Sequence, residues 1–504
     1  MSVLDRLGEL MIVGVPGTSL DAETEAALRR IGPAGAILFS ENYADAEGAA
    51  TMTRALHALL GTPELPALLS IDEEGGLVSR LSHFWEVPPS ARAVGSSGGP
   101  PLVRDLATRT ARRLLALGFN LDFAPCLDID TNPWNPVINV RSFGETPSQV
   151  SACGRAAIEG FLSVGVIPCA KHFPGHGDTS LDSHVALPRV DADVPLLSRR
   201  ELRPFEAAVQ AGVPMVMTGH VLVPAMEPDP RTTATLSRAI VTGWLREKIG
   251  FDGVIITDAL EMAGATGLGS HGEVAVRAIE AGVDLLLYSK LSPGPEEGLA
   301  ALREAVSSGR LSEARVAESL ERMRKLRAGS AARVGPWSAD LERQARDLIL
   351  PDELTRICEG AIRVMKQGAG GIPLKGPVAV LEISRSEGRA RMSDLFHANG
   401  MEAEEYSTDP ATWPTRIKGS ALMTVASRTK LGEADTALAR AWLTRFPETV
   451  TVASVNPHIC DEWPEVRTVL ATFDNGPAAR RGLVRRLAGV GLVTPGSGRR
   501  RPAS

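Results

Sequence analysis

The sequence lacks any run of eighteen consecutive apolar residues, the length at which a membrane-spanning helix becomes a candidate. It also lacks the pattern of a secretory signal peptide. Asp5 and Glu9 stand where such a peptide carries a positive patch followed by an apolar core. We therefore expect a cytoplasmic protein that has no membrane-spanning segment.

Cysteine is scarce and shows no sign of a disulfide framework. The five cysteines are odd in number, and none of them forms a Cys-x-x-Cys pair. We interpret them as small buried hydrophobic residues of a protein in a reducing compartment. They are Cys126, Cys153, Cys169, Cys358 and Cys460.

An excess of positive charge is absent as well. The 54 lysines and arginines are outnumbered by 60 aspartates and glutamates, which gives a net charge of −6. This balance argues against a broad nucleic-acid-binding surface. With 44% hydrophobic and 23% charged residues, the 504-residue chain is globular and long enough for two or three domains.

The first 330 residues repeat one alternation, in which a short apolar run is followed by a helical pattern. Apolar runs without alternation suit strands that are buried on both faces of a parallel sheet. Eight such units predict a (β/α)8 barrel over residues 1–330. The expected strands are residues 11–15, 34–39, 67–72, 120–125, 166–173, 214–220, 253–258 and 284–289, and clear helical patterns cover 21–31, 102–117, 200–211 and 273–281.

Polar residues stand where several of these apolar runs end. Barrel enzymes place their chemistry at the carboxyl ends of the strands, so these residues are candidates for an active site. A carboxylate such as Asp258, which follows a wholly apolar run, is costly to bury without a role or a partner. Capping of a helix over residues 259–262 is the structural alternative for Asp258. The strand-end residues are Asp72, Asp128, Lys171, His172, His220 and Asp258.

The segment from Lys171 to His184 holds three of the nine histidines of the chain. Asp182 precedes His184 by two residues, and a carboxylate on one ring nitrogen makes the other a better base. Three other interpretations compete with catalysis. The histidines could be solvated loop residues, or His172, His176, Asp182 and His184 could bind zinc, although their spacing matches no zinc signature. Lys171 could form a Schiff base, as in an aldolase.

A second, smaller domain is expected after a linker. The helical pattern at 315–327 closes the barrel, residues 331–350 form the linker, and residues 351–495 form an α/β domain. We predict a helix at 354–366 and strands at 378–383, 422–427, 450–455 and 469–473, in an open sheet with helices on both faces. The tail at 496–504 is rich in Gly, Ser, Pro and Arg and is expected to be disordered.

The barrel part resembles glycoside hydrolase family 3, and within it the β-N-acetylglucosaminidase branch. Matching segments include Ile-Asp-Glu-Glu-Gly-Gly at 71–76, Arg-Ser-Phe-Gly at 141–144 and Gly-Phe-Asp-Gly-Val-Ile-Ile-Thr-Asp at 250–258. The most specific match is Lys-His-Phe-Pro-Gly-His-Gly-Asp-Thr-Ser-Leu-Asp-Ser-His at 171–184. Two residues depart from the family pattern: Glu73 and Leu77 stand where an amide and an arginine are more common.

The resemblance implies a retaining exo-glycosidase that removes terminal β-linked N-acetylglucosamine, typically from muropeptides and other peptidoglycan fragments. It implies that Asp258 is the nucleophile and that His184, paired with Asp182, is the general acid and base. It places five residues on the terminal sugar: Asp72, Arg80, Arg141, Lys171 and His172. No step calls for a metal or an organic cofactor, and no catalytic residue is assigned to the second domain.

Three alternative functions remain. In a glycoside phosphorylase, a histidine base would repel an attacking phosphate less than a carboxylate does. A β-glucosidase or xylosidase of the same family is a second alternative, which the Asp182-Ser183-His184 end argues against. A catalytically inactive sugar-binding protein is the third, and the presence of both Asp258 and His184 argues against it.

Overall fold

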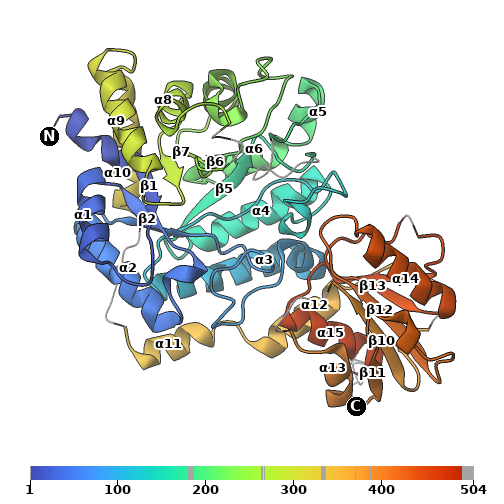
Figure 1. Ribbon diagram of the computed structural model, residues 1–504. Helices are drawn as coiled ribbons and strands as arrows, with labels where there is room; N and C mark the ends of the chain where they lie inside the picture. Colours follow the sequence, from blue (N-terminus) through green and yellow to red (C-terminus); the bar gives the residue numbers. More distant parts are fainter. Residues whose placement is uncertain are drawn as a thin grey trace, which may run out of the picture. The chain divides into compact units, whose positions relative to one another are not determined.

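The computed structural model describes residues 2–179, 187–262, 265, 267–330, 337–368, 371–384, 389–461 and 463–490. Internal contacts divide the chain into two units, Met1–Leu350 and Pro351–Ser504. Figure 1 shows strands surrounded by helices in the first unit and a sheet with helices on both faces in the second.

The first unit is an eight-stranded parallel barrel, as the sequence predicts. Each predicted apolar run contains one strand, and the strands are ordered β7-β6-β5-β4-β3-β2-β1-β8. The barrel is nearly closed, since β7 and β8 meet through a parallel bridge between Ile256 and Leu285. The strands are β1 (Met11–Gly14), β2 (Gly35–Ile37), β3 (Leu68–Ile71), β4 (Leu121–Asp122), β5 (Ile167–Phe173), β6 (Met215–Thr218), β7 (Val254–Thr257) and β8 (Leu286–Tyr288).

Helices follow most of the strands, and many begin at a side-chain cap. Asp21, Asp45 and Thr146 each accept a backbone N–H of the first helical turn, which satisfies a donor that has no partner within the helix. The helices are α1 (Ala22–Ile31), α2 (Ala46–Leu60), α3 (Ala91–Ala116), α4 (Pro147–Leu162), α5 (Val194–Arg199), α6 (Arg203–Gln210), α8 (His271–Ala281), α9 (Gly294–Ser307), α10 (Glu313–Gly329) and α11 (Ala339–Arg346), with short or irregular helices at Leu4–Leu10, Ser40–Asn42, Asn139–Arg141, Ala234–Leu236 and Ala239–Lys248.

The interior of the barrel is filled by apolar side chains from all eight strands, with Met323 of α10 packed among them. Arg327 of the same helix donates to the carbonyl of Pro66, just before β3, at 2.9 Å. Helix α10, which contains the helical pattern predicted at residues 315–327, therefore covers the amino ends of the strands. The carboxyl ends, where the polar residues stand, lie at the opposite end of the barrel.

The seam between β7 and β8 is held by Asp284, whose side chain is fully buried. One carboxylate oxygen accepts the N–H of Ile255 at 3.0 Å, and the other accepts the hydroxyl of Ser319 at 2.7 Å. Arg246 and Arg315 pair with the same carboxylate. A buried charge with this many partners ties β7, β8 and α10 together.

The second unit is an open six-stranded sheet. One apolar core is formed between one face of the sheet and helix α14. A second apolar core is formed between the opposite face and helices α13 and α15. The sheet order is β11-β10-β12-β13-β14-β9, and only β9 is antiparallel to its neighbour. Its elements are α12 (Pro351–Ala361), β9 (Arg363–Lys366), β10 (Val378–Ile383), α13 (Met392–Ala398), β11 (Ala403–Glu405), a short helix at Pro410–Thr412, β12 (Ser420–Val425), α14 (Glu433–Arg445), β13 (Val450–Ala453), β14 (Thr468–Ala471) and α15 (Pro477–Ala488).

The prediction of one helix over residues 354–366 is wrong at its end. The helix stops at Ala361, and residues 363–366 form the edge strand β9, which pairs with β14. All four residues of β9 are exposed. The segment therefore shows neither the alternation of a half-buried strand nor the periodicity of an amphipathic helix, and the sequence does not reveal it as a strand. The short edge strand β11 also escapes sequence reasoning, because two of its three residues are glutamates.

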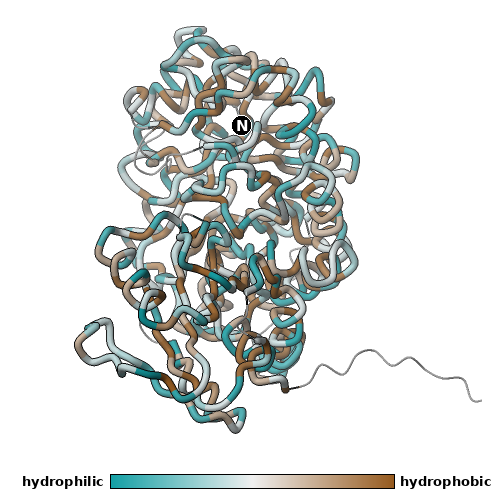
Figure 2. The backbone as a smooth tube through the Cα atoms, turned by 90° about the vertical axis from the view of Figure 1, so that its right-hand side faces the viewer, coloured by the Kyte–Doolittle hydropathy of each residue, from teal (hydrophilic) through white to brown (hydrophobic). Residues whose placement is uncertain are grey.

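The segment expected to be a linker, residues 331–350, contains α11. Ala345 and Ile349 of this segment are buried, and Arg109 of α3 donates to the carbonyl of Leu348 at 3.1 Å. Residues 496–504, expected to be disordered, lie outside the described residues. In the described part of the chain, no helix is long and apolar enough to cross a membrane. Figure 2 shows hydrophilic and hydrophobic residues interspersed along the chain.

Candidate active site

The predicted strand-end residues gather at the carboxyl end of the barrel. Asp72 directly follows β3, Lys171 and His172 directly precede the last residue of β5, and Asp258 directly follows β7. Arg80 and Arg141 come from the segments after β3 and β4. Neighbouring parallel strands end at the same rim, which brings together side chains that are far apart in the sequence.

Lys171 lies between two carboxylates. Its Nζ is 2.9 Å from Asp72 Oδ1 and 2.7 Å from Glu74 Oε1, and its side chain is only 3% exposed. Burial alone would lower the pKa of Lys171, but Asp72 and Glu74 outweigh it and hold that pKa above its usual value. Lys171 is therefore held as an ammonium ion, whereas a lysine that forms a Schiff base must react as a neutral amine.

Glu74 is a site residue that the sequence analysis did not single out. Its carboxylate pairs with both Nε and Nη2 of Arg141, at 2.9 and 2.8 Å, in addition to Lys171. Burial raises the pKa of Glu74, but Arg141 and Lys171 overcome this effect and hold it well below its usual value. The one signal in the sequence that points to Glu74 is its position two residues after Asp72, because residues two apart point to the same side of an extended chain.

Asp72 and Arg80 are the more accessible part of this network. Arg80 Nη2 is 3.4 Å from Asp72 Oδ2, and the two side chains are 30% and 18% exposed. The guanidinium of Arg80 also lies over the ring of Phe39, 5.4 Å from its centroid. A carboxylate and a cation side by side offer an acceptor and donors to the hydroxyl groups of a sugar.

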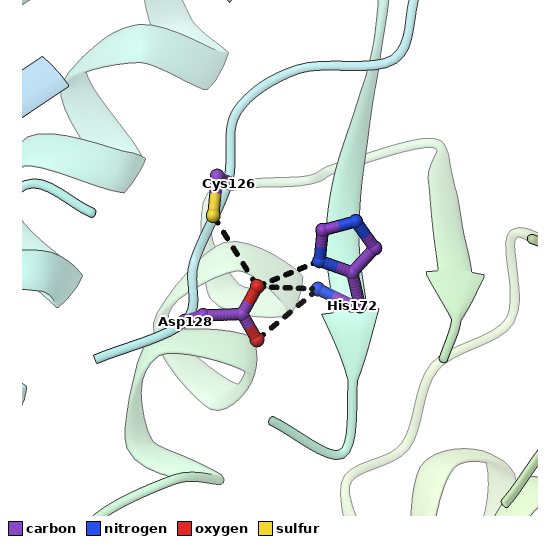
Figure 3. Close-up of side chains that lie close together, drawn as sticks. All are labelled: Cys126, Asp128 and His172. Atoms are coloured by element: carbon purple, nitrogen blue, oxygen red, sulfur yellow. Dashed lines mark hydrogen bonds and ion pairs between the residues drawn. The ribbon is translucent and has the colours of Figure 1, made fainter. Parts of the chain in front are cut away.

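His172 is oriented by Asp128, a strand-end residue from the segment after β4. Figure 3 shows the carboxylate between the imidazole and the thiol of Cys126. Asp128 Oδ2 is 2.7 Å from His172 Nδ1, and the backbone N–H of His176 donates to Oδ1 at 2.6 Å. Burial raises the pKa of Asp128, but His172 and His176 lower it to about 2, so the group is an anion. An anionic acceptor places the proton of His172 on Nδ1 and leaves Nε2 for a ligand.

The same cluster brings together side chains that could ligate a metal. Ligand atoms of Cys126, Asp128 and His172 lie within 4.8 Å of one another, and this is the one such group among the described residues. Burial raises the pKa of the Cys126 thiol well above its usual value, and that thiol donates to Asp128 Oδ2 at 3.2 Å. The Cys126 thiol and Nδ1 of His172 are both hydrogen-bonded to Asp128, so in this structure the cluster is a hydrogen-bond network around that carboxylate.

His176 takes a structural position in the described part of the loop. Its Nδ1 is 2.7 Å from the hydroxyl of Thr179, and the amide of Asn135 donates to its carbonyl at 2.8 Å. Burial lowers the pKa of His176 to about 4, so its ring is neutral at neutral pH. The remaining N–H of a neutral imidazole is a very weak acid, so His176 is a poor general acid.

Asp258 occupies a half-buried position at the rim, within electrostatic reach of the imidazoles of His172 and His220. Its Oδ1 accepts the N–H of Ala259 at 2.8 Å, and its own N–H donates to the carbonyl of Thr218 at 3.0 Å. Burial raises the pKa of Asp258, but His172 and His220 hold it below the usual value. Residues 259–262 form a turn, so the helix whose capping was the alternative explanation for Asp258 does not form there.

Two of the predicted catalytic residues, Asp182 and His184, lie outside the described residues. The fold and the described rim nevertheless define a class. An anionic carboxylate stands beside buried cations and imidazoles at the carboxyl end of a (β/α)8 barrel, an arrangement suited to an enzyme that binds a polar substrate.

The model of the glycosyl hydrolase family 3 N-terminal domain matches residues 2–326, which includes every described residue of the rim. The chain belongs to glycoside hydrolase family 3. The family that the sequence motifs indicate is thus confirmed.

Curated relatives match the barrel unit. The chain is 35% identical over 332 residues to beta-hexosaminidase A of Pseudoalteromonas piscicida, a match that covers 62% of this chain and 56% of that protein. It therefore spans just over half the length of that relative. It is 36% identical over 324 residues to a beta-hexosaminidase of Chromobacterium violaceum, covering 62% of this chain and 86% of that one.

One solved structure is similar over nearly the whole chain. It is described as a glycoside hydrolase family 3 beta-N-acetylglucosaminidase from Paenibacillus sp. str. FPU-7. The TM-score is 0.87 with 32% sequence identity, and the alignment covers 97% of each chain. The arrangement of a barrel followed by a smaller α/β domain, which the sequence predicts, is thus found in a solved member of the family.

Proposed function

We propose that the protein is a retaining exo-β-N-acetylglucosaminidase that removes terminal β-linked N-acetylglucosamine. The observation that carries this proposal is the position of Asp258, directly after β7 at the rim that also holds Lys171 and His172. A retaining glycosidase needs an anionic carboxylate as nucleophile, and His172 and His220 hold the pKa of Asp258 below its usual value. The relatives described as hexosaminidases and the Paenibacillus acetylglucosaminidase support the choice of sugar.

In the first half-reaction, an oxygen of Asp258 attacks the anomeric carbon of the terminal sugar. The bond from that carbon to the leaving oxygen breaks, and a proton passes to the leaving group. We assign this proton to His184, with Asp182 stabilising the imidazolium and fixing its orientation. In the second half-reaction, His184 takes a proton from water, which displaces Asp258 and restores the β configuration.

The rest of the rim holds the sugar in place. Asp72 accepts hydrogen bonds from hydroxyl groups, while Arg80, Arg141 and Lys171 supply donors. Lys171 and Arg141 are also locked by Glu74, so they are positioned before a ligand arrives. His172, with its Nδ1 committed to Asp128, presents Nε2 to the substrate. Such preorganisation lowers the entropy lost when the substrate is bound and aligned.

We also propose the natural substrates and the compartment. Fragments of peptidoglycan that end in β-linked N-acetylglucosamine, such as muropeptides, present the sugar that this site would bind. Cytoplasmic action on such fragments would require them to be imported first. Purified muropeptides can test this choice, with chitobiose as the competing substrate and the ratio of kcat/KM values as the measure.

The central experiment uses an aryl N-acetyl-β-glucosaminide with and without phosphate. We expect release of free N-acetylglucosamine with retained configuration, at a rate that phosphate does not change. Formation of a sugar phosphate would establish the phosphorylase alternative instead. Faster cleavage of the matching aryl β-glucoside would establish a glucosidase, and a folded protein without turnover on either glycoside would leave only sugar binding.

A further inference from the structure

The buried carboxylate of Glu73 accepts hydrogen bonds from three consecutive residues. The hydroxyl of Ser79 lies 2.8 and 2.9 Å from its two oxygens, and the backbone N–H groups of Arg80 and Leu81 lie 2.9 and 3.3 Å from Oε2. Glu73 itself is only 3% exposed. A side chain six to eight residues earlier thus closes the loop at 73–81, which has no regular helix or strand of its own.

Glu73 is in turn anchored to the barrel. Its backbone N–H donates to Asp122 Oδ1 of β4 at 2.9 Å. Within the loop, Glu74 and Val78 are joined by a backbone hydrogen bond of 2.9 Å. The chain at Arg80 is therefore fixed relative to two adjacent strands, β3 and β4. This fixed position brings the guanidinium of Arg80 beside Asp72.

The surroundings of Glu73 are buried and contain few charges. Asp122 lies on β4, the guanidinium of Arg113 on α3, and the phenol of Tyr43 on the segment after β2, and Arg80 lies on the loop itself. Burial raises the pKa of Glu73 to about 7, despite the hydrogen bonds from Ser79, Arg80 and Leu81. Because a carboxyl group is costly to ionise at such a buried position, its presence there indicates that the hydrogen bonds it accepts serve a function.

We propose that Glu73 is a positioning residue that holds Arg80 beside Asp72 and thereby sets the affinity of the site for the terminal sugar. Glu73 touches neither the sugar nor the reacting atoms, and it acts through the loop. This inference rests on the proposed function, because the role of Arg80 in sugar binding belongs to it.

The chemistry of the side chain allows a sharp comparison. In Glu73→Gln, the amide oxygen can still accept from Arg80 and Leu81, and the amide NH₂ can donate to Ser79, whose hydroxyl also accepts. In Glu73→Ala, no acceptor remains for the three donors. Ser79→Ala is intermediate, because it removes the hydroxyl donor and leaves both backbone donors paired with the carboxylate.

Steady-state kinetics on the aryl N-acetyl-β-glucosaminide test the proposal. We expect KM to rise about tenfold in Glu73→Ala, in line with the loss of several buried hydrogen bonds, while kcat changes less than threefold. Glu73→Gln should restore KM to within about twofold of the wild type, and Ser79→Ala should fall between them. Glu359→Gln is the matched control, because it changes another buried carboxyl group with a raised pKa in the second unit.

Amide hydrogen exchange tests the loop without reference to activity. The amides of Arg80 and Leu81 should exchange faster in Glu73→Ala and at the wild-type rate in Glu73→Gln. If this holds but no glycoside is cleaved, the proposed function fails while the loop contact stands. Wild-type KM in a folded Glu73→Ala protein would overturn the inference, as would an equal rise of KM in the glutamine and alanine variants.

Discussion

The carboxylate of Asp128 holds Nδ1 of His172 at 2.7 Å while it also accepts the backbone N–H of His176 at 2.6 Å. One buried anion therefore orients the imidazole at the end of β5 and the start of the loop that leads to Asp182 and His184. Since Asp128 comes from the segment after β4, two neighbouring strand ends of the barrel share this contact.

Replacement of Asp128 by asparagine should lower kcat/KM by about 10- to 100-fold. The amide keeps the shape but is a weaker acceptor, and hydrogen bonds to charged groups contribute about 1.5–3 kcal/mol each. It also permits the other tautomer of His172, so that Nε2 would carry the proton. Kinetics on the aryl glycoside check the loss, and unchanged kcat/KM would remove Asp128 from the site.

Asp258→Ala should abolish turnover while the fold survives. Loss of a covalent nucleophile from a catalytic unit costs several orders of magnitude in kcat, here expected to be about 10⁴-fold or more. Circular dichroism and the unfolding temperature serve as the folding control. A folded variant with near-wild-type kcat would show that another group is the nucleophile.

His184→Ala should lose activity in a way that depends on the leaving group. A dinitrophenyl leaving group needs little protonation, whereas a natural sugar leaving group needs it strongly. The first half-reaction should therefore fall by about 10²–10⁴-fold on natural β-linked N-acetylglucosaminides and far less on dinitrophenyl ones. Azide needs no deprotonation, so it should partly rescue the second half-reaction and form a β-glycosyl azide.

Asp182→Asn provides the matched milder variant, because the imidazole of His184 remains but its orienting charge is lost. Equal losses of His184→Ala on both leaving groups, together with no azide product, would reassign His184 to sugar binding. His176, the next histidine of the loop, has its pKa lowered to about 4 and would then be a poor replacement as acid.

Asp284→Asn should destabilise the barrel without a direct effect on the rim. The change leaves Arg246 and Arg315 at the β7–β8 seam without their buried anion. Breaking a buried pair on one side typically costs about 3–5 kcal/mol of unfolding free energy. Denaturant unfolding measures this loss. Asp340→Asn is the control, because Asp340 also pairs with an arginine but its side chain is 75% exposed, and it should cost less than about 1 kcal/mol.

Glu73→Gln should become more stabilising as the pH rises. The pKa of Glu73 is raised in the folded protein from 4.5 to about 7. Its contribution to stability is therefore fully present below about pH 4.5 and is lost as the pH rises through about 7. The difference in pKa between the folded and unfolded protein corresponds to at most about 3 kcal/mol of unfolding free energy. Unfolding of both proteins between pH 5 and pH 8 should show a widening gap in favour of glutamine, and a constant gap would contradict the raised pKa.

The barrel could be predicted because its strands are short apolar runs that end in polar residues. A parallel strand that is buried on both faces needs a continuous run of hydrophobic residues, and such a run can be recognised in the sequence of each strand alone. Strand β9 could not be found in this way, since all its residues are exposed and its place depends on pairing with β14. Edge strands are defined by a neighbour rather than by their own pattern.

The sequence by itself determined the eight strand–helix units, the family, and the polar residues that stand where the apolar runs end. Only the tertiary structure decided how those residues are paired. That Lys171 is locked by both Asp72 and Glu74, and that Asp128 orients His172, depends on contacts between residues 44 to 99 positions apart. Such contacts arise from the closure of the sheet, and no local pattern in the chain specifies them. The same holds for Glu73, whose carboxylate sets the Arg80 loop only because the barrel buries it.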